Sequence, residues 1–254
     1  ESSVSVNSNT RFPEVLNGPD YMQWFSRAEE MDNDYLINTN QDPKALTYTQ
    51  SQIDALRNGT NTNPLFGNTD WVGELLGKTS TTQSHAITVR GGTEKVKYFS
   101  SLGYLDQDGI VENTDYKRYN LRTNLDAQLN SLLSVSLDLG ARLQKTNTPG
   151  ISPDNSAYMN PFYQAVRTLP NMPMYAENGL PTAYASNAGY VNPLASVSQS
   201  GYQRGETNVF QSTLTFNVKA PWIKGLAGKL LVSYDKNATQ NKGWTTPYKL
   251  MGRT

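Results

Sequence analysis

The chain has 254 residues, of which 22 are basic, 22 are acidic, one is histidine and none is cysteine. Without cysteine it has no disulfide framework, no zinc–thiolate site and no thiol nucleophile, and a single histidine does not make a multi-histidine metal site. A net charge of zero is untypical of nucleic-acid-binding proteins, which carry clustered basic residues, so we expect no nucleic-acid partner. Only 37% of the residues are apolar, and 15 Tyr stand against 7 Phe, which indicates a thin core and many rings at boundaries between apolar and wet surroundings.

The N-terminal part predicts one short strand, over residues 4–9, followed by a long connection over residues 11–80. Helical spacing within this connection predicts a helix over residues 19–34 and two shorter helices over residues 51–58 and 70–76. No apolar run in the chain is long enough for a membrane-spanning helix. The chain opens with neither an initiator Met nor a signal-peptide stretch, so we expect it to be an excerpt of a longer protein.

The clearest pattern is an alternation of apolar and polar residues with period two, which predicts strands over residues 84–91, 95–106, 117–129 and 132–145. The last two strands are separated only by a tight turn and therefore form a hairpin. One face of this hairpin carries leucines, valine and alanines. The opposite face carries the charged residues Arg122, Asp126, Asp138 and Arg142.

The C-terminal part predicts a second long connection over residues 146–203, with a helix over residues 155–168. Two more alternating strands follow over residues 207–219 and 226–238, which brings the expected total to about seven. If successive strands run up and down, all the short turns lie at one end of the sheet and all the long connections at the other. Outer-membrane barrels have this arrangement, with short periplasmic turns and long extracellular loops, whereas soluble sandwiches have no reason for it.

The sequence therefore predicts an all-β fold: an antiparallel, up-and-down segment of a transmembrane β-barrel whose long outer loops carry short helices. A strand of 11 residues tilted near 45° spans about 25 Å, the height of the apolar band of such barrels. Tyr104, Tyr119 and Tyr234 are expected at the outer membrane interface and Trp222 at the inner one, while the four charged residues named above face a watery lumen. An exposed antiparallel sheet of a soluble protein also alternates, and this interpretation stays open on periodicity alone.

Several blocks of the sequence resemble the SusC/RagA family, the TonB-dependent outer-membrane transporters of Bacteroidota. The similarity is dense from about residue 13 to residue 146 and looser afterwards. The blocks that carry it are Pro13–Tyr21, Arg27–Ala28, Asn68–Leu76, Ile87–Tyr104 and Leu105–Arg122.

This resemblance implies a 22-stranded barrel in the outer membrane of a Gram-negative cell, an N-terminal plug, a TonB box that engages the energy-transducing TonB complex, and a SusD-like surface lipoprotein over the extracellular mouth. It implies oligosaccharide or peptide cargo. The sequence contains neither plug nor TonB box and only about seven strands, so it departs from the family pattern by truncation.

Enzyme chemistry finds little support in the sequence, and we expect no catalytic residue, no cofactor and no metal. The sequence contains no Gly-x-Ser-x-Gly motif, so no nucleophilic serine is indicated for which His85 could act as the base. Residues 106–112 look like a calcium loop, but the glycine and the glutamate stand at the wrong places for an EF-hand. A polar hairpin loop is the preferred interpretation there, with a loosely bound calcium ion as the alternative.

Aromatic side chains in the long connections are the candidate ligand-binding residues, because their rings can stack on sugar faces or pack against a lid protein. The alternative is that they form the small cores of the loops themselves. The candidates are Trp24, Tyr158, Tyr163, Tyr175, Tyr184 and Tyr190.

Functionally, the sequence predicts part of an active outer-membrane importer. Two alternatives remain. One is a soluble, secreted β-sandwich that binds carbohydrate through Tyr and Trp, and the other is a passive porin without a plug.

Overall fold

The computed structural model describes residues 2–7, 15–151, 160–183, 192–223 and 225–252. The chain divides into two compact units. The sheet unit comprises Glu1–Ser8, Thr79–Thr148 and Tyr202–Trp244, and the helical unit comprises Asn9–Lys78, Pro149–Gly201 and Thr245–Thr254. Each unit has its own internal packing, and each is described by itself.

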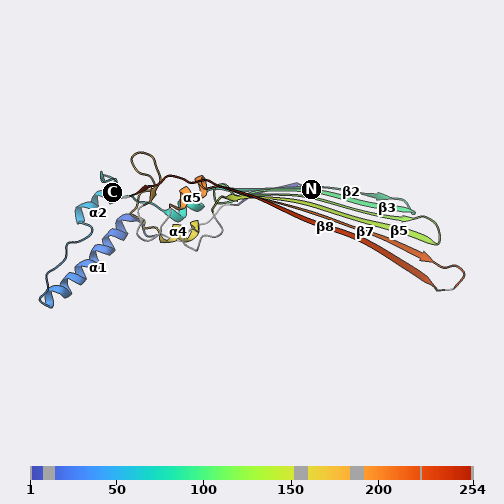
Figure 1. Ribbon diagram of the computed structural model, residues 1–254, viewed down its shortest axis with the longest axis horizontal. Coiled ribbons are helices and arrows are strands. Elements are labelled where there is room, and N and C mark those ends of the chain that lie inside the picture. The colour runs from blue at the N-terminus through green and yellow to red at the C-terminus, as the bar shows by residue number, and fades with distance from the viewer. Residues whose placement is uncertain (1, 8–14, 152–159, 184–191, 224, 253–254) are drawn as a thin grey trace. The chain divides into compact units, whose positions relative to one another are not determined.

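The sheet unit is a seven-stranded sheet with the order β1-β2-β3-β4-β5-β7-β8, so the strands of this sheet lie side by side in the order in which they occur in the chain (Figure 1). Antiparallel pairs join β1 through β5. This is the up-and-down arrangement that the sequence predicts. The strands are β1 (Ser2–Asn7), β2 (Ser80–Gly92), β3 (Val96–Asp108), β4 (Asp115–Gln128), β5 (Leu133–Pro149), β7 (Gly201–Lys219) and β8 (Ala227–Thr245).

Several strands are longer than the alternation predicts. β2 begins at Ser80 rather than at residue 84, β7 begins at Gly201 rather than at 207, and β8 continues to Thr245 rather than to 238. The additional residues are mostly polar on both faces, so the period-two signal fades although the backbone pairing continues. At 19 residues and about 3.3 Å per residue, β7 and β8 are each roughly 60 Å long.

Local side-chain chemistry forms the short turns. Between β4 and β5, the Asn130 Oδ1 atom accepts hydrogen bonds from the backbone N–H groups of Leu132 at 2.8 Å and Leu133 at 2.9 Å. Between β2 and β3, the Thr93 hydroxyl accepts from the Val96 N–H at 3.2 Å. Between β7 and β8, Gly225 has a φ of 87°, a conformation that glycine adopts without strain.

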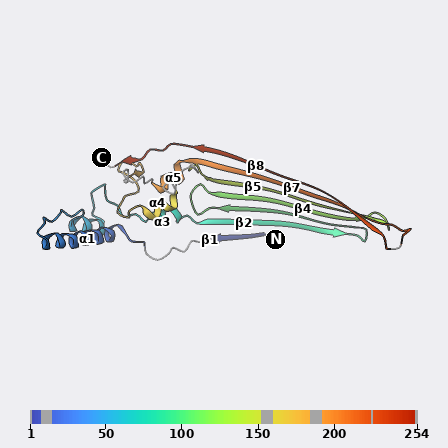
Figure 2. The same ribbon diagram turned by 60° about the horizontal axis from the view of Figure 1, so that its bottom comes forward.

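The helical unit contains five described helices, of which α1, α3, α4 and α5 are labelled in Figure 2. It also contains a short parallel pair of β6 (Thr182–Ala183) and β9 (Met251–Gly252). Polar side chains cap the helix starts: Thr49 forms a capping box with Gln52, and Asn160 and Asn192 accept from the first turns of the helices that follow them. The helices are α1 (Gly18–Asn38), α2 (Gln50–Arg57), α3 (Trp71–Leu76), α4 (Pro161–Arg167) and α5 (Pro193–Gln199).

Two differences from the sequence-based expectation concern these helices. α4 begins at Pro161, because Asn160 is its cap, while residues 155–159 of the expected helix lie outside the described part of the chain. α5 was not expected, although Asn192 is a recognisable cap and is followed by Pro193 in the first turn.

The core of the helical unit forms where α1 meets α2 and the segment before it. Met22 and Ile53 are fully buried beside Tyr48. Tyr48 makes edge contacts with the rings of Phe25 and Phe66, at centroid distances of 5.6 and 5.8 Å. The face of α1 that carries Met22 therefore holds the helix in place. Within the described residues, no helix is both long and apolar enough to cross a bilayer.

Candidate functional site

The strand register places Leu102 of β3 and the leucines of β4 and β5 in rows on one face of the sheet. Leu102 lies opposite Leu121, which lies opposite Ala141, and Leu125 lies opposite Leu137. Leu102 is 54% exposed and Leu121 is 45% exposed. We call this surface the apolar face.

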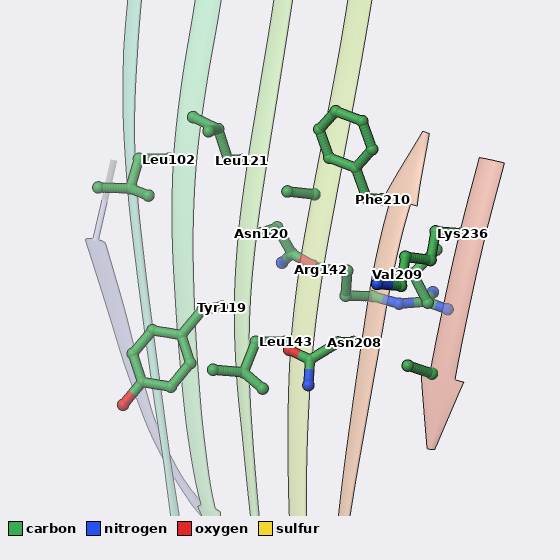
Figure 3. A pocket seen from close by; sticks show the side chains of 12 residues that line it. Leu102, Tyr119, Asn120, Leu121, Arg142, Leu143, Asn208, Val209, Phe210 and Lys236 are labelled. Atoms are coloured by element: carbon green, nitrogen blue, oxygen red, sulfur yellow. The ribbon is translucent and has the colours of Figure 1, made fainter. Parts of the chain in front are cut away.

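Within the residues that the structure describes, no second layer of the sheet unit covers the apolar face. Among the described residues, the buried apolar side chains belong to the helical unit with the single exception of Val111. A β-sandwich would bury these rows between two sheets. Figure 3 shows apolar side chains side by side along a shallow hollow of this face, with Leu102, Tyr119, Leu121, Leu143 and Phe210 among those that line it.

A row of rings crosses the apolar face toward the end where the long connections leave the sheet. Tyr104 lies opposite Tyr119 with ring centroids 4.9 Å apart, and His85 stacks on Tyr104 at 6.4 Å with an interplanar angle of 7°. On β7 and β8, Phe210 lies 6.3 Å from Tyr234. We call these five residues the girdle. His85, for which the sequence offers no catalytic partner, is thus part of an aromatic row.

Trp222 lies at the opposite end of the strands, in the turn between β7 and β8, and is 77% exposed. The Tyr104 hydroxyl donates a hydrogen bond of 2.6 Å to Asp106, which lies further from that turn end along the same strand. Rings at both ends of an apolar band, with a polar group turned away from the band, are typical of a membrane-spanning wall.

The opposite face of the sheet is polar and carries all four of the expected lumen-facing residues. Arg122 lies opposite Gly140, Arg142 opposite Asn120, Asp138 opposite Asn124, and Asp126 opposite Lys97. Since residues directly opposite in a sheet share a face, these positions alternate with the leucine rows. The polar face therefore carries its charges mainly on β4 and β5, while β3 contributes Lys97 together with the apolar Phe99 and Leu105.

Asn124 connects the charges of the polar face. The Arg122 Nε atom donates to the Asn124 Oδ1 atom at 3.3 Å, and the Asn124 amide donates to the Asp138 carboxylate. A hollow of about 650 Å³ brings Arg122, Asp138 and Arg142 together with Asp235 of β8, while Asp126 is outside its lining. Such a surface can hold water, polar cargo or another polar protein surface.

The aromatic candidates of the helical unit lie on separate segments. Trp24 is on α1 and 64% exposed. Tyr175 forms an isolated β-bridge with Pro181 and is 54% exposed. Tyr163 is on α4, with the Arg167 guanidinium 4.9 Å from its ring centroid. Tyr158, Tyr184 and Tyr190 lie outside the described residues.

The buried rings of the helical unit are different ones, Tyr48 and Trp71, and the Trp71 indole donates to the Leu169 carbonyl at 3.1 Å. In the segment after β8, burial raises the pKa of the Tyr248 phenol above its ordinary value. The small core of this unit is thus formed by aromatics other than the described candidates.

Residues 106–112, whose sequence resembles a calcium loop, form the end of β3 and part of the hairpin connection to β4. The Gly109 N–H donates to the Thr114 carbonyl at 2.8 Å, and Asn113 takes a φ of 59°. Within the described part of the chain, no group of three or more His, Asp or Glu side chains is arranged to hold a metal ion.

Comparison with known proteins gives this geometry a family context. No family model matches the chain. The chain is 27% identical over 161 residues to TonB-dependent receptor P26 of Formosa agariphila, covering 62% of this chain and 15% of that protein. Over 58 residues it is 34% identical to TonB-dependent receptor SusC of Bacteroides thetaiotaomicron, covering 23% of this chain and 6% of SusC. The fold of the RagAB peptide transporter matches 94% of this chain and 28% of that chain, with a TM-score of 0.66 and 18% identity.

The chain is a relative of the SusC/RagA-type TonB-dependent receptors. A structure of the RagAB peptide importer in its open-open state matches as well, with a TM-score of 0.59 and 19% identity, over 94% of this chain and 27% of that chain. These comparisons confirm the expected family and the expected barrel-type fold. The chain spans about 15% of the length of the P26 receptor.

SusC/RagA-type receptors are β-barrel proteins of the outer membrane. The named relatives are receptors and transporters rather than enzymes, which agrees with the expectation that the chain is not an enzyme.

Proposed function

We propose that the protein to which this chain belongs is an active importer of oligosaccharides or peptides across the outer membrane, and that the sheet unit is part of its barrel wall. The observation that carries the proposal is the two-sided sheet: an uncovered apolar face bounded by the girdle, and a charged polar face behind it. A surface of this kind is stable only between hydrocarbon and water.

The number of strands supports a larger barrel. Seven strands are fewer than the eight of the smallest single-chain barrels, and the outer-membrane transporters with a plugged lumen have about 22. We therefore propose that further strands complete the wall beside β1 and β8. The polar face would then surround a plug, through which the TonB complex supplies energy.

We also propose a SusD-like surface lipoprotein as the partner at the outer mouth. One structural neighbour is named a peptide transporter, which supports an importer of peptide or oligosaccharide cargo. The comparisons do not choose between these two classes of cargo for this chain. Exposed rings such as Trp24 and Tyr175 offer apolar surface for stacking on sugars or for contact with a lid protein. Among the described residues these are the proposed ligand-contacting side chains, together with Tyr163.

Uptake by cells that produce the intact protein tests this proposal. Fluorescently labelled oligosaccharides and peptides are supplied to cells with the gene, to cells without it, and to cells treated with a proton-motive-force uncoupler. Energised import predicts uptake that needs the gene and falls to the background of the deletion strain when the uncoupler is present.

Two results would overturn the proposal. Gene-dependent uptake that the uncoupler leaves unchanged would identify a passive porin. Recovery of the intact protein from the aqueous fraction without detergent would identify a soluble binding module.

A further inference from the structure

The outward surface immediately beyond the membrane band is rich in lysine. Lys117 comes two residues beyond Tyr119 on β4, Lys145 two residues beyond Leu143 on β5, and Lys236 two residues beyond Tyr234 on β8. Because side chains two residues apart in a strand share a face, these lysines point to the same side as the apolar face. Lys236 also lines the hollow of the apolar face with Leu121 and Phe210, whereas Lys117 and Lys145 do not, so the last two are the cations that lie beyond the band.

Two of these lysines lie directly opposite each other, since Lys117 pairs with Lys145 in the β4–β5 register. Like charges directly opposite in a sheet are destabilising. Each lysine has a carboxylate on the strand that flanks the pair. Asp106 on β3 lies 3.1 Å from Lys117, and Glu206 on β7 lies 3.6 Å from Lys145. The two acids therefore pair with the ammonium groups from the flanking strands, one on each side of the lysine pair.

A hollow of about 770 Å³ extends from this pair across β7 and β8. Arg204 and Lys242 line it with the two lysines, and the Arg204 Nε atom donates to the Asn147 side chain at 3.3 Å. The acids in the lining are Asp115 and Glu206, so cations outnumber acids in the hollow. Arginine and lysine together are the side chains that bind phosphate oxygens most strongly.

The position of the lysine pair relative to the membrane favours one type of anion. Two residues of a strand tilted near 45° place Lys117 and Lys145 about 5 Å beyond the girdle, which is the headgroup layer of a bilayer. Lysines at such a level extend their apolar stems along lipid and present their charge to the headgroups. We infer that Lys117, Lys145 and Arg204 bind the phosphate of an outer-leaflet lipid headgroup. The inference rests on the proposed function only for the placement of the sheet in the outer membrane.

Native mass spectrometry on the intact, detergent-purified protein tests this inference. The probes are a monophosphorylated lipid A, the same lipid without its phosphate, and inorganic phosphate alone. Replacing both Lys117→Gln and Lys145→Gln is expected to weaken binding of the phosphorylated lipid roughly 30-fold and to leave the dephosphorylated lipid unaffected. The matched control is Lys95→Gln with Lys219→Gln, two lysines at the turn end of the strands, which should leave both lipids bound as before.

Three outcomes would overturn the inference: unchanged affinity in the Lys117/Lys145 variant, equal loss for both lipids, or binding of inorganic phosphate that displaces the lipid. The measurement does not depend on transport. A protein that prefers the phosphorylated lipid but shows no energised uptake contradicts the proposed function alone, whereas one that imports normally without a phosphate preference contradicts this inference alone.

Discussion

At the scale of single residues, neighbours in a strand face different solvents. Leu137 lies opposite Leu125 on the apolar face, while the adjacent Ser136 lies opposite Asp126 on the polar face. In the proposed barrel wall, a charge at position 137 meets hydrocarbon, whereas a charge at position 136 meets water and the Asp126 carboxylate. A charged residue is therefore expected to destabilise the protein strongly at position 137 but not at position 136.

Leu137→Arg is expected to destabilise the assembled protein by about 2 to 4 kcal/mol, because a guanidinium near the middle of the membrane is poorly solvated. Ser136→Arg places the same side chain beside Asp126 and should cost far less. Urea unfolding of the intact protein in lipid vesicles measures both. Equal losses in the two variants would show that the faces are assigned wrongly.

Asn130 is a second residue with a separable effect, because its side chain accepts two backbone hydrogen bonds within the β4–β5 turn. Asn130→Ala should destabilise the hairpin by about 1 to 2 kcal/mol, since both N–H groups lose their acceptor. Ser131→Ala in the same turn is the control. Hydrogen exchange at Leu132 and Leu133 should quicken in the first variant only, and unaltered exchange there would refute the role of the turn.

At the scale of elements, α1 has one packed face and one open face. Met22 is fully buried, and Ser26 donates to the Tyr48 carbonyl at 2.8 Å on the same face. Trp24 and Met31 lie on the other side of the helix and are largely exposed. The helix therefore depends on the Met22 face for its position and keeps the Trp24 face available for contact.

Met22→Ala is expected to destabilise the helical unit by about 2 to 5 kcal/mol, as removal of a fully buried Met side chain leaves a cavity. Met31→Ala, in the same helix and 66% exposed, should change stability by no more than about 0.5 kcal/mol. Limited proteolysis of the intact protein within residues 38–50 reports the difference. Comparable cleavage of both variants would contradict the packing described for α1.

The sequence predicts the strands well where one face is apolar and the other polar, and it predicts their ends less well where both faces are polar. Alternation between residues 117 and 145 fixes which side of β4 and β5 is apolar, because leucine and charge repeat with period two. The ends of β7 and β8 beyond the girdle are mostly polar on both faces, so their sequence shows no alternation of apolar and polar residues from which the strands could be predicted. The lysine pair likewise depends on the register between β4 and β5, which residue types alone do not give.

At the scale of the whole molecule, the seven-stranded sheet has two open edges, at β1 and at β8. Each edge presents unpaired backbone groups, and the apolar face adds exposed leucine. Both features are stable in a closed barrel within a membrane, and neither is stable in water.

The 254-residue chain produced by itself should therefore require detergent to stay dispersed. Sedimentation in plain buffer is expected to show large aggregates, because open strand edges and leucine rows associate. The comparison is the same chain in detergent. A monomer in plain buffer that melts in one sharp transition would contradict the membrane assignment.

The period-two alternation across the hairpin of β4 and β5 also determines which length changes the wall can accept. One added residue in the middle of β4 would exchange inside for outside over the rest of that strand, turning Arg122 or Asp126 toward hydrocarbon. Two added residues would restore parity and only lengthen the strand. Natural and engineered variants of this wall should thus differ in strand length by even numbers, while odd insertions should be confined to the connections or accommodated by a β-bulge.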